Sequence, residues 1–445
     1  MQSPRAKSDR TDSDIGIAGG DPGSRGLVRL VDPLGMIERR RTILLLAAVS
    51  LALCCLIFPD IGWWPLSYFC LVPWLICVCT TAKARFLYFV SYLLGLGYFL
   101  INIRWMCPVT PPGYFALCAM DALSFPLAAW PIRHLYRRRG FSVALAAPFA
   151  WVAFEYLRSI GPTGFPWLLL GHSQYRVPVV IQISDLVGAY GVSFVLMMVN
   201  GWITDLLIQP ILVGRRDGST RLPLGSVTTL TAMASVLIYG GAQLSRDYLE
   251  DGPRIAMIQH DIPMYVNPRP GQRLGSHTVF EAHLELARRA AAEKPDLIVL
   301  PETIVSCYMN REFLEADRGA LQEIVRRRWP GEAVSGLEAA QAFGKQVRDA
   351  FQQLSNETGI PIVVGSSSLE WRPADLPPRV AAYNSAFLIK PGEQQPVARY
   401  DKRHLVLFGE YVPFRYSYNS IYEWLNSLTP WGAKGGHYSL TPGND

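Results

Sequence analysis

The sequence predicts a polytopic α-helical membrane domain followed by an α/β domain that lies outside the membrane. Apolar stretches of about 17 to 20 residues recur between residues 42 and 244, each long enough for a helix to cross the ~30 Å hydrocarbon layer. From Arg254 on, short apolar runs alternate with amphipathic helices. With 445 residues, half of them apolar and only 18% charged, the chain is too hydrophobic for an ordinary soluble protein and too long for one domain.

The first half of the chain divides into a tail and a membrane domain. Residues 1–35 are rich in Ser, Asp, Gly and Arg, which is typical of a disordered cytoplasmic tail. Residues 36–245 are predicted to form a membrane domain with about seven transmembrane helices. The first apolar stretch is interpreted as a permanent span rather than a signal peptide, because six more spans follow it. The predicted spans cover residues 42–58, 63–80, 86–103, 114–130, 142–157, 187–208 and 226–244.

Positively charged loop residues predict the orientation of these spans. Clusters of Arg and Lys precede the first span and follow the second, fourth and sixth spans, so all of them fall on one side of the membrane. By the positive-inside rule that side is the cytoplasm, and seven crossings place everything after about residue 245 outside. The clusters are Arg39 to Arg41, Lys83 and Arg85, Arg133 and Arg137 to Arg139, and Arg215, Arg216 and Arg221.

Charge and cysteine content exclude several other classes of protein. Loop arginines that orient helices account for most of the formal net charge of +6, so no nucleic-acid partner is predicted. Seven of the eight cysteines lie in or beside the predicted spans, where a thiol behaves as a small apolar side chain. Cys307 is therefore the single cysteine of the extracytoplasmic domain, and no disulfide framework, metal site or cofactor is predicted.

The second half of the chain has the pattern of an α/β sheet. Residues 254–259 and 296–300 are continuous apolar runs typical of strands covered on both faces, and residues 280–292 between them predict an amphipathic helix. A longer helix is predicted at residues 336–355. Two more strands are predicted at residues 360–365 and 382–389. The α/β domain is expected to occupy residues 250–445.

Glu302 is the first candidate catalytic residue. It follows four apolar residues and a proline, which places it at the carboxyl end of a predicted strand, where ligands bind in α/β sheets. A partly buried carboxylate at that position is expected to have a pKa raised towards neutrality and to accept a proton from a thiol as a general base. The alternative is a strand-end Glu that caps or pairs locally.

Lys402 and Glu410 are the other two candidates. Lys402 lies in a charged segment, which by itself indicates a solvated face, but the apolar run at residues 405–408 is expected to bury its surroundings. A buried ammonium can stabilise the oxyanion of a tetrahedral intermediate. Glu410, next to Gly409, is expected to orient Lys402 or the nucleophile; the alternative is a plain salt bridge to Lys402 or Arg403.

The motifs around these residues resemble the nitrilase-type domain of bacterial apolipoprotein N-acyltransferases. The membrane half contains motifs similar to that family's membrane loops, and the resemblance covers about residues 40 to 443. In the second half the motifs are residues 301–303 (Pro-Glu-Thr), 383–385 (Tyr-Asn-Ser), 400–402 (Tyr-Asp-Lys), 404–405 (His-Leu) and 408–413 (Phe-Gly-Glu-Tyr-Val-Pro). In the first half they are residues 154–158, 163–167, 171–174 and 188–191.

The resemblance implies a fold, a reaction and a location. The fold is a membrane helical bundle that carries a nitrilase-like αββα sandwich in the periplasm, anchored in the bacterial inner membrane. A cysteine thiolate takes an acyl chain from a phospholipid donor and passes it to the N-terminal amine of a diacylglyceryl lipoprotein acceptor. By the same resemblance, Glu302 is the general base, Lys402 the oxyanion stabiliser and Glu410 a supporting carboxylate.

The sequence departs from the family pattern after residue 439. In the family the nucleophilic cysteine lies on a later strand, followed by Tyr and Glu, and a final span returns to the cytoplasm. Here residues 439–443 resemble the approach to that strand, and the sequence stops at Asp445. The sequence therefore predicts a truncated acyltransferase without the nucleophile and the eighth span, with a separate C-terminal fragment as a partner for the exposed sheet edge. Cys307, five residues after Glu302, is an alternative nucleophile, weighed against a structural cysteine.

Two other functions stay open at this point. One is a catalytically inactive homologue that binds lipid or lipoprotein without turning it over. The other is a membrane-tethered amidase that transfers an acyl group to water. The amidase ranks last, because it needs the same cysteine and does not account for the membrane-loop motifs.

Overall fold

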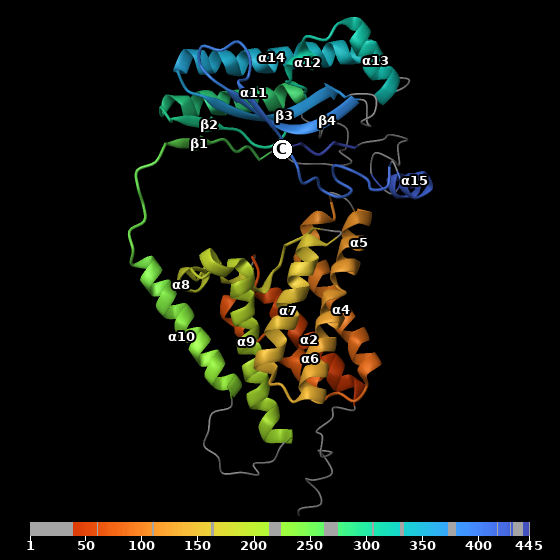
Figure 1. Ribbon diagram of the computed structural model, residues 1–445, viewed down its shortest axis with the longest axis vertical. Coiled ribbons are helices and arrows are strands. Elements are labelled where there is room, and N and C mark those ends of the chain that lie inside the picture. Colours follow the sequence, from red (N-terminus) through yellow and green to blue (C-terminus); the bar gives the residue numbers. More distant parts are fainter. Residues whose placement is uncertain are drawn as a thin grey trace, which may run out of the picture. The chain divides into compact units, whose positions relative to one another are not determined.

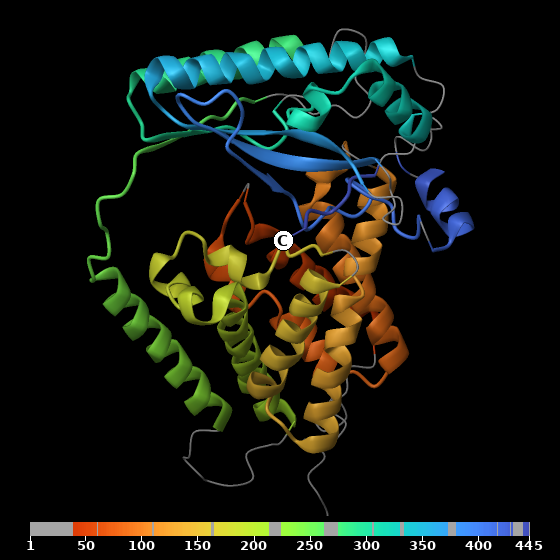
Figure 2. The ribbon, with the colours of Figure 1, turned by 45° about the horizontal axis from the view of Figure 1, so that its top comes forward.

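The chain forms two compact units, which are described separately (Figures 1 and 2). Unit 1 consists of Met1–Tyr98, Ala122–Tyr156 and Leu168–Gln243, and unit 2 of Phe99–Asp121, Leu157–Trp167 and Leu244–Asp445. The computed structural model describes residues 39–59, 61–108, 111–161, 164–212, 224–261, 275–304, 307–329, 333–372, 380–415, 417–427, 429 and 439–444. The tail expected at residues 1–35 lies outside these ranges.

Apolar helices make up unit 1, and one whole helix (Pro111–Asp121) and the ends of others belong to unit 2. They are α2 (Arg40–Leu56), α3 (Val72–Thr80), α4 (Ala84–Asn102), α5 (Pro111–Asp121), α6 (Ser124–Arg139), α7 (Val143–Ile160), α8 (Pro178–Ile181), α9 (Ser184–Leu212) and α10 (Leu224–Leu244), with 3₁₀ turns η1 (Trp64–Tyr68), η2 (Arg104–Met106) and η3 (Leu170–Gln174).

Within the described ranges, five helical segments are long and apolar enough to cross a membrane. They are Ala84–Asn102, Pro111–Arg139, Val143–Ile160, Ser184–Ile208 and Leu224–Leu244. The first two predicted spans correspond to the shorter helix α2 and to Trp64–Thr80. The count of seven spans stays a prediction.

Buried polar side chains connect the helices of unit 1. The Asn200 amide on α9 accepts a hydrogen bond from the Leu71 N–H at 2.9 Å and donates one to the Ser67 carbonyl at 2.8 Å. Asp205, one turn further along, accepts hydrogen bonds from the N–H groups of Val143 and Ala144 at 3.0 Å each. These N–H groups open helix α7 and would otherwise lack an intrahelical partner, so the Asp205 carboxylate of α9 caps the N-terminus of α7.

A five-stranded mixed sheet forms the framework of unit 2. The strands β1 (Ile255–Met257), β2 (Leu297–Val299), β3 (Ile362–Trp371), β4 (Val380–Ile389) and β5 (Ala398–Asp401) are neighbours in that order. β1, β2 and β3 are parallel, whereas β4 runs antiparallel to both β3 and β5. The strands and the two helices expected from the sequence are confirmed, and this mixed sheet with its helices agrees with the nitrilase-like fold that the sequence motifs imply.

Helices cover the sheet of unit 2 and supply its core. α11 (Ser276–Ala292), α12 (Arg311–Leu314), α13 (Arg318–Arg328) and α14 (Val334–Thr358) lie on the same side of the sheet in both views (Figures 1 and 2). Phe280 of α11, Phe351 of α14 and Ile362 of β3 belong to one buried cluster. Strand β5 and helix α13 were not expected from the sequence, because β5 is short and charged and α13 ends in three arginines.

The register of β4 places polar side chains on both faces of the sheet. Asn384 pairs with Ser367, whereas the next residue, Ser385, pairs with Ser366 on β3 and with Asp401 on β5. Because side chains alternate along a strand, Asn384 and Ser385 project to opposite faces. One face therefore carries the side chain of Asn384, and the other carries those of Ser385 and its partner Asp401.

Candidate active site

A tight turn after β2 positions Glu302. The Leu300 N–H donates to the Val363 carbonyl at 2.9 Å, which keeps the chain paired with β3 up to the turn. Thr303, directly after Glu302, has φ 49°, a left-handed conformation that is costly for a β-branched residue. A Cβ atom at Gly365 of β3 would lie 2.2 Å from the Pro301 carbonyl oxygen, so only glycine lets the turn pack this closely. The sheet thus fixes the backbone of Glu302.

Lys402 joins the two predicted carboxylates into one cluster. It follows β5, and its N–H donates to the Asn384 carbonyl at 2.8 Å. Its Nζ lies 2.9 Å from Oε1 of Glu302 and 3.0 Å from Oε1 of Glu410. The three residues predicted from the sequence therefore meet at one ammonium group, and the salt bridge expected as an alternative for Glu410 is present within the same cluster.

Asn384 is a fourth member of the cluster, to which the sequence reasoning gave no role. Its Nδ2 group donates to Oε1 of Glu302 and, at 3.0 Å, to Oε1 of Glu410. Its Oδ1 accepts from the Thr303 hydroxyl at 3.1 Å. The sequence offered one indication of this role, which is an amide side chain inside a strand of mostly apolar residues. A buried polar group needs hydrogen-bond partners, so such an amide is expected to contact other polar residues. Asn384 positions both carboxylates from the middle of β4.

The loop that carries Glu410 differs from the prediction in its burial. Val406 and Phe408 are 55% and 38% exposed, so the expectation that residues 405–408 bury the lysine is wrong. The loop is held by polar contacts instead, since Oε2 of Glu410 accepts from the Val406 N–H at 2.8 Å. The Glu410 side chain is only 13% exposed. One carboxylate oxygen of Glu410, Oε2, therefore binds the loop backbone, and the other, Oε1, accepts from Lys402 and Asn384.

The charges of Glu302 and Lys402 stabilise each other. Burial alone would raise the pKa of the Glu302 carboxyl, but the hydrogen bond and charge of Lys402 and the hydrogen bond from Asn384 together lower it below its ordinary value. Burial alone would lower the pKa of Lys402, but Glu302 and Glu410 raise it. The predicted rise of the Glu302 pKa towards neutrality is therefore wrong: the carboxylate is ionised and able to accept a proton.

This pairing predicts a pH window for stability. A carboxyl whose pKa falls on folding stabilises the fold above its unfolded pKa, here 4.5, and loses that contribution as the pH falls through its folded pKa. A lysine whose pKa rises contributes fully below 10.5 and loses its contribution above that pH. Thermal unfolding should show a smaller drop between pH 6 and pH 3 in Lys402→Met than in the parent chain. Identical drops would show that the pair adds no stability.

Cys307 is a buried structural cysteine in this fold. Its Sγ lies 3.4 Å from the Ser366 hydroxyl, and it belongs to the hydrophobic cluster that includes Ile304 and Met309. Burial raises the pKa of the thiol from 9.0 to about 11, although the Ser366 hydrogen bond acts in the opposite direction. A thiol with this pKa is protonated at neutral pH, so the structure does not support Cys307 as the alternative nucleophile.

A labelling experiment follows from the burial of Cys307. A pKa near 11 instead of 9.0 lowers the thiolate fraction at neutral pH about 100-fold, and burial also hinders access of a reagent. Peptide mapping after iodoacetamide treatment should therefore find Cys307 unmodified in the native chain and modified in denaturant. Rapid labelling of native Cys307, at the rate of a small free thiol, would contradict this assignment.

Residues 439–444 run beside the cluster. The Leu440 N–H donates to the Glu410 carbonyl at 2.7 Å, the Thr441 N–H to the Ala382 carbonyl at 2.8 Å, and the Gly443 N–H to the Lys402 carbonyl at 3.0 Å. A Cβ atom at Gly443 would lie 2.3 Å from the Asp401 carbonyl oxygen, so a side chain does not fit there. Two of these backbone hydrogen bonds are accepted by Glu410 and Lys402, so the segment helps to hold the backbone of both residues in place.

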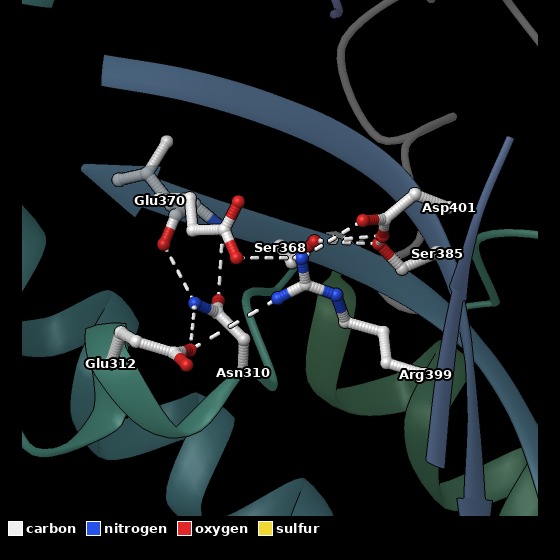
Figure 3. A network of polar contacts seen from close by, with 8 residues as sticks. Asn310, Glu312, Ser368, Glu370, Ser385, Arg399 and Asp401 are labelled. Atoms are coloured by element: carbon white, nitrogen blue, oxygen red, sulfur yellow. Dashed lines mark hydrogen bonds and ion pairs between the residues drawn. The ribbon is translucent and has the colours of Figure 1, made fainter. Parts of the chain in front are cut away.

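The opposite face of β4 and β5 carries a second polar network (Figure 3). Asp401 accepts from the Ser385 hydroxyl at 2.5 Å through Oδ1 and from Nη2 of Arg399 at 2.8 Å through Oδ2. Arg399 also donates to Oε1 of Glu370 on β3 at 2.7 Å. Figure 3 shows these side chains converging between the strands. The network holds the end of β5, so it fixes the backbone from which Lys402 reaches the other face.

Two family models match successive parts of the chain. The Apolipoprotein N-acyltransferase N-terminal domain matches residues 50–202, within the helical region, and Carbon-nitrogen hydrolase matches residues 254–435, which include the Glu302–Lys402 cluster. The second match begins at Arg254, where the sequence pattern changes.

Curated relatives match across both regions. An apolipoprotein N-acyltransferase of Geobacter metallireducens is 30% identical over 383 residues, which cover 83% of this chain and 64% of the relative. Proteins of the same description from Chlorobaculum tepidum and Allorhizobium ampelinum are 24% and 27% identical and cover 84% and 83% of this chain. The chain spans 64% to 65% of the length of these relatives.

Proposed function

The chain belongs to the apolipoprotein N-acyltransferase family, and on that premise we propose that it acts in the transfer of a fatty acyl chain from a phospholipid to the N-terminal diacylglyceryl-cysteine amine of lipoproteins. The observation that carries the proposal is the Lys402 ammonium, bound between Glu302 at 2.9 Å and Glu410 at 3.0 Å at the ends of β2 and β5. An ionised base beside a cation matches what acyl transfer requires.

In the proposed first half-reaction, Glu302 accepts the proton of a cysteine thiol, and the thiolate attacks the ester carbonyl carbon of the phospholipid. The Lys402 ammonium stabilises the oxyanion of the tetrahedral intermediate. Collapse of the intermediate breaks the ester bond, and the departing lysophospholipid oxygen takes the proton from Glu302. The acyl chain remains on the cysteine as a thioester.

In the second half-reaction, the lipoprotein amine attacks the thioester carbonyl and gives a proton to Glu302. The carbon–sulfur bond then breaks, and the thiolate regains that proton as a thiol. Glu410 and Asn384 act as positioning residues, because each contacts Lys402 or Glu302 rather than the reacting carbon. Both substrates are lipids, which accounts for the attachment of the site to apolar helices.

We further propose the surroundings in which this reaction takes place. The chain lies in the bacterial inner membrane with its N-terminus in the cytoplasm and its α/β domain in the periplasm, as the loop arginines indicate. The thiol comes from a segment outside residues 1–445, because Cys307 is buried with a raised pKa. The hydrogen bond from Gly443 to the Lys402 carbonyl supports a docking position for that segment beside Lys402.

An acylation assay tests the proposed function. The 445-residue chain is purified in detergent, with and without a co-expressed cysteine-bearing segment, and is mixed with phospholipid vesicles and a synthetic diacylglyceryl lipopeptide. With the cysteine-bearing segment present, mass spectrometry should detect the N-acylated lipopeptide. The substitution Glu302→Gln should abolish this product. A matched control is Glu315→Gln, which removes a carboxylate from an exposed ion pair with Arg311 at 2.9 Å. Acylation that persists in Glu302→Gln would refute the role of Glu302.

A second candidate function is a catalytically inactive homologue that binds lipid or lipoprotein. The burial and raised pKa of Cys307 favour it, since the described part of the domain places no thiolate beside Glu302 and Lys402. The same assay separates the two functions. Lipopeptide that binds to the chain without being acylated, in the presence and in the absence of the second segment, would support binding alone.

A further inference from the structure

A groove lies where helices α2 and α4 begin, and it shares no residue with the Glu302–Lys402 cluster. It has a volume of about 550 Å³ and belongs entirely to unit 1. The groove is shallow and largely open to its surroundings. Its lining consists of Arg40, Lys83, Ala84, Arg85, Phe86 and Phe89.

The polar part of the groove is cationic. Arg40, Lys83 and Arg85 all line it and are exposed. None of the described residues that line it is acidic, and neither α2 nor α4 has an acidic residue in its first turn. Three like charges at one groove repel one another and create a positive potential that attracts an anion. The groove therefore has the charge complementary to a phosphate group.

The rest of the groove is apolar. The Arg40 guanidinium lies 5.1 Å from the centre of the Phe86 ring, which places the cation over an aromatic face. Phe89, one turn further along α4, is 56% exposed. α4 is one of the segments long and apolar enough to cross a membrane, and the first turn of a spanning helix is where lipid headgroups would meet it. A ligand that fits has an anionic head beside the cations and an apolar chain beside Phe89.

We propose that this groove binds the phosphate headgroup of an anionic phospholipid, with an acyl chain lying along Phe89. This lipid is a bound component of the membrane domain and not the acyl donor, so the inference goes beyond the proposed function. Positive charges in the loops also orient the spans in the membrane, but this effect depends on how many charges lie on one side of the membrane. A binding site depends on their convergence, and this difference can be measured.

Matched double variants separate the two explanations. The full chain, purified in detergent, is titrated with phosphatidylglycerol or with phosphatidylcholine, and bound lipid is counted by native mass spectrometry. The groove variant is Arg40→Gln/Arg85→Gln. The control, Arg138→Gln/Arg139→Gln, removes the same charge from exposed positions in the last turn of α6. Phosphatidylglycerol should bind preferentially, and the groove variant should bind it about 10-fold more weakly while the control changes less than about twofold.

Further arms identify what the groove recognises. Phe89→Ala keeps every cation in the groove. It should weaken the binding of phosphatidylglycerol, while the ability of inorganic phosphate to compete with the lipid should stay unchanged. This variant also decides the question if the double variant fails to insert into the membrane. Equal losses in the groove and control variants would overturn the proposal, as would full displacement of the lipid by millimolar inorganic phosphate. The readout is lipid binding, so its outcome is independent of acyl transfer.

Discussion

Replacing Lys402 with Met is expected to slow acyl transfer about 100- to 1,000-fold and to raise the pKa of Glu302 above its ordinary range. Loss of an oxyanion-stabilising group typically costs about 100- to 1,000-fold in rate. Without the ammonium, Glu302 and Glu410 keep their hydrogen bonds to the same Asn384 amide, so two carboxylates face each other and one of them takes up a proton. The rate is measured by N-acylation of the lipopeptide, and the ionisation of Glu302 by carboxylate infrared absorption as a function of pH.

The control for this variant is Lys345→Met, which removes an exposed lysine from α14. It should change neither the acylation rate nor the carboxylate titration. The infrared measurement does not require turnover, so it tests the geometry of the cluster even if the chain only binds its substrates. An unchanged titration of Glu302 in Lys402→Met would contradict the cluster described above.

Gly365→Ala is expected to have the largest effect on stability. Its new Cβ atom would lie 2.2 Å from the Pro301 carbonyl oxygen and 2.9 Å from the Glu302 Cα atom. Both neighbours are backbone atoms, so the turn after β2 has to move. Overpacking of this kind costs about 1–3 kcal/mol, and a displacement of about 1 Å at a reacting group costs about 100-fold in rate. Thermal unfolding and the acylation assay measure the two effects.

Gly336→Ala is the matched control. Gly336 lies in the first turn of α14, where no atom is within 4 Å of the added Cβ and the backbone is helical. Alanine at such a position leaves stability unchanged or raises it by about 0.4–1 kcal/mol. Equal unfolding temperatures for the two variants would show that the turn after β2 accommodates a methyl group and that Gly365 does not fix Glu302.

Particular residues show how far prediction from sequence reaches in this chain. Glu302 was predictable because four apolar residues and a proline place it at the end of a strand, and the structure confirms that position. The direction of its pKa shift was not, because Lys402 lies 100 positions away in the sequence and 2.9 Å away in space. Asn384 was missed for the same reason, since its partners Glu302 and Glu410 are 82 and 26 positions away.

The sequence by itself determined the apolar helices, the strands of the second half and the identity of the three charged candidates, because these depend on local periodicity and short motifs. Only the tertiary structure decided that Lys402 lowers the pKa of Glu302, that Asn384 holds both carboxylates and that the Cys307 thiol is buried with a raised pKa. The physical reason is that charge state and reactivity depend on the groups within hydrogen-bond distance and on burial. Those neighbours are brought together by strand pairing across long stretches of the chain.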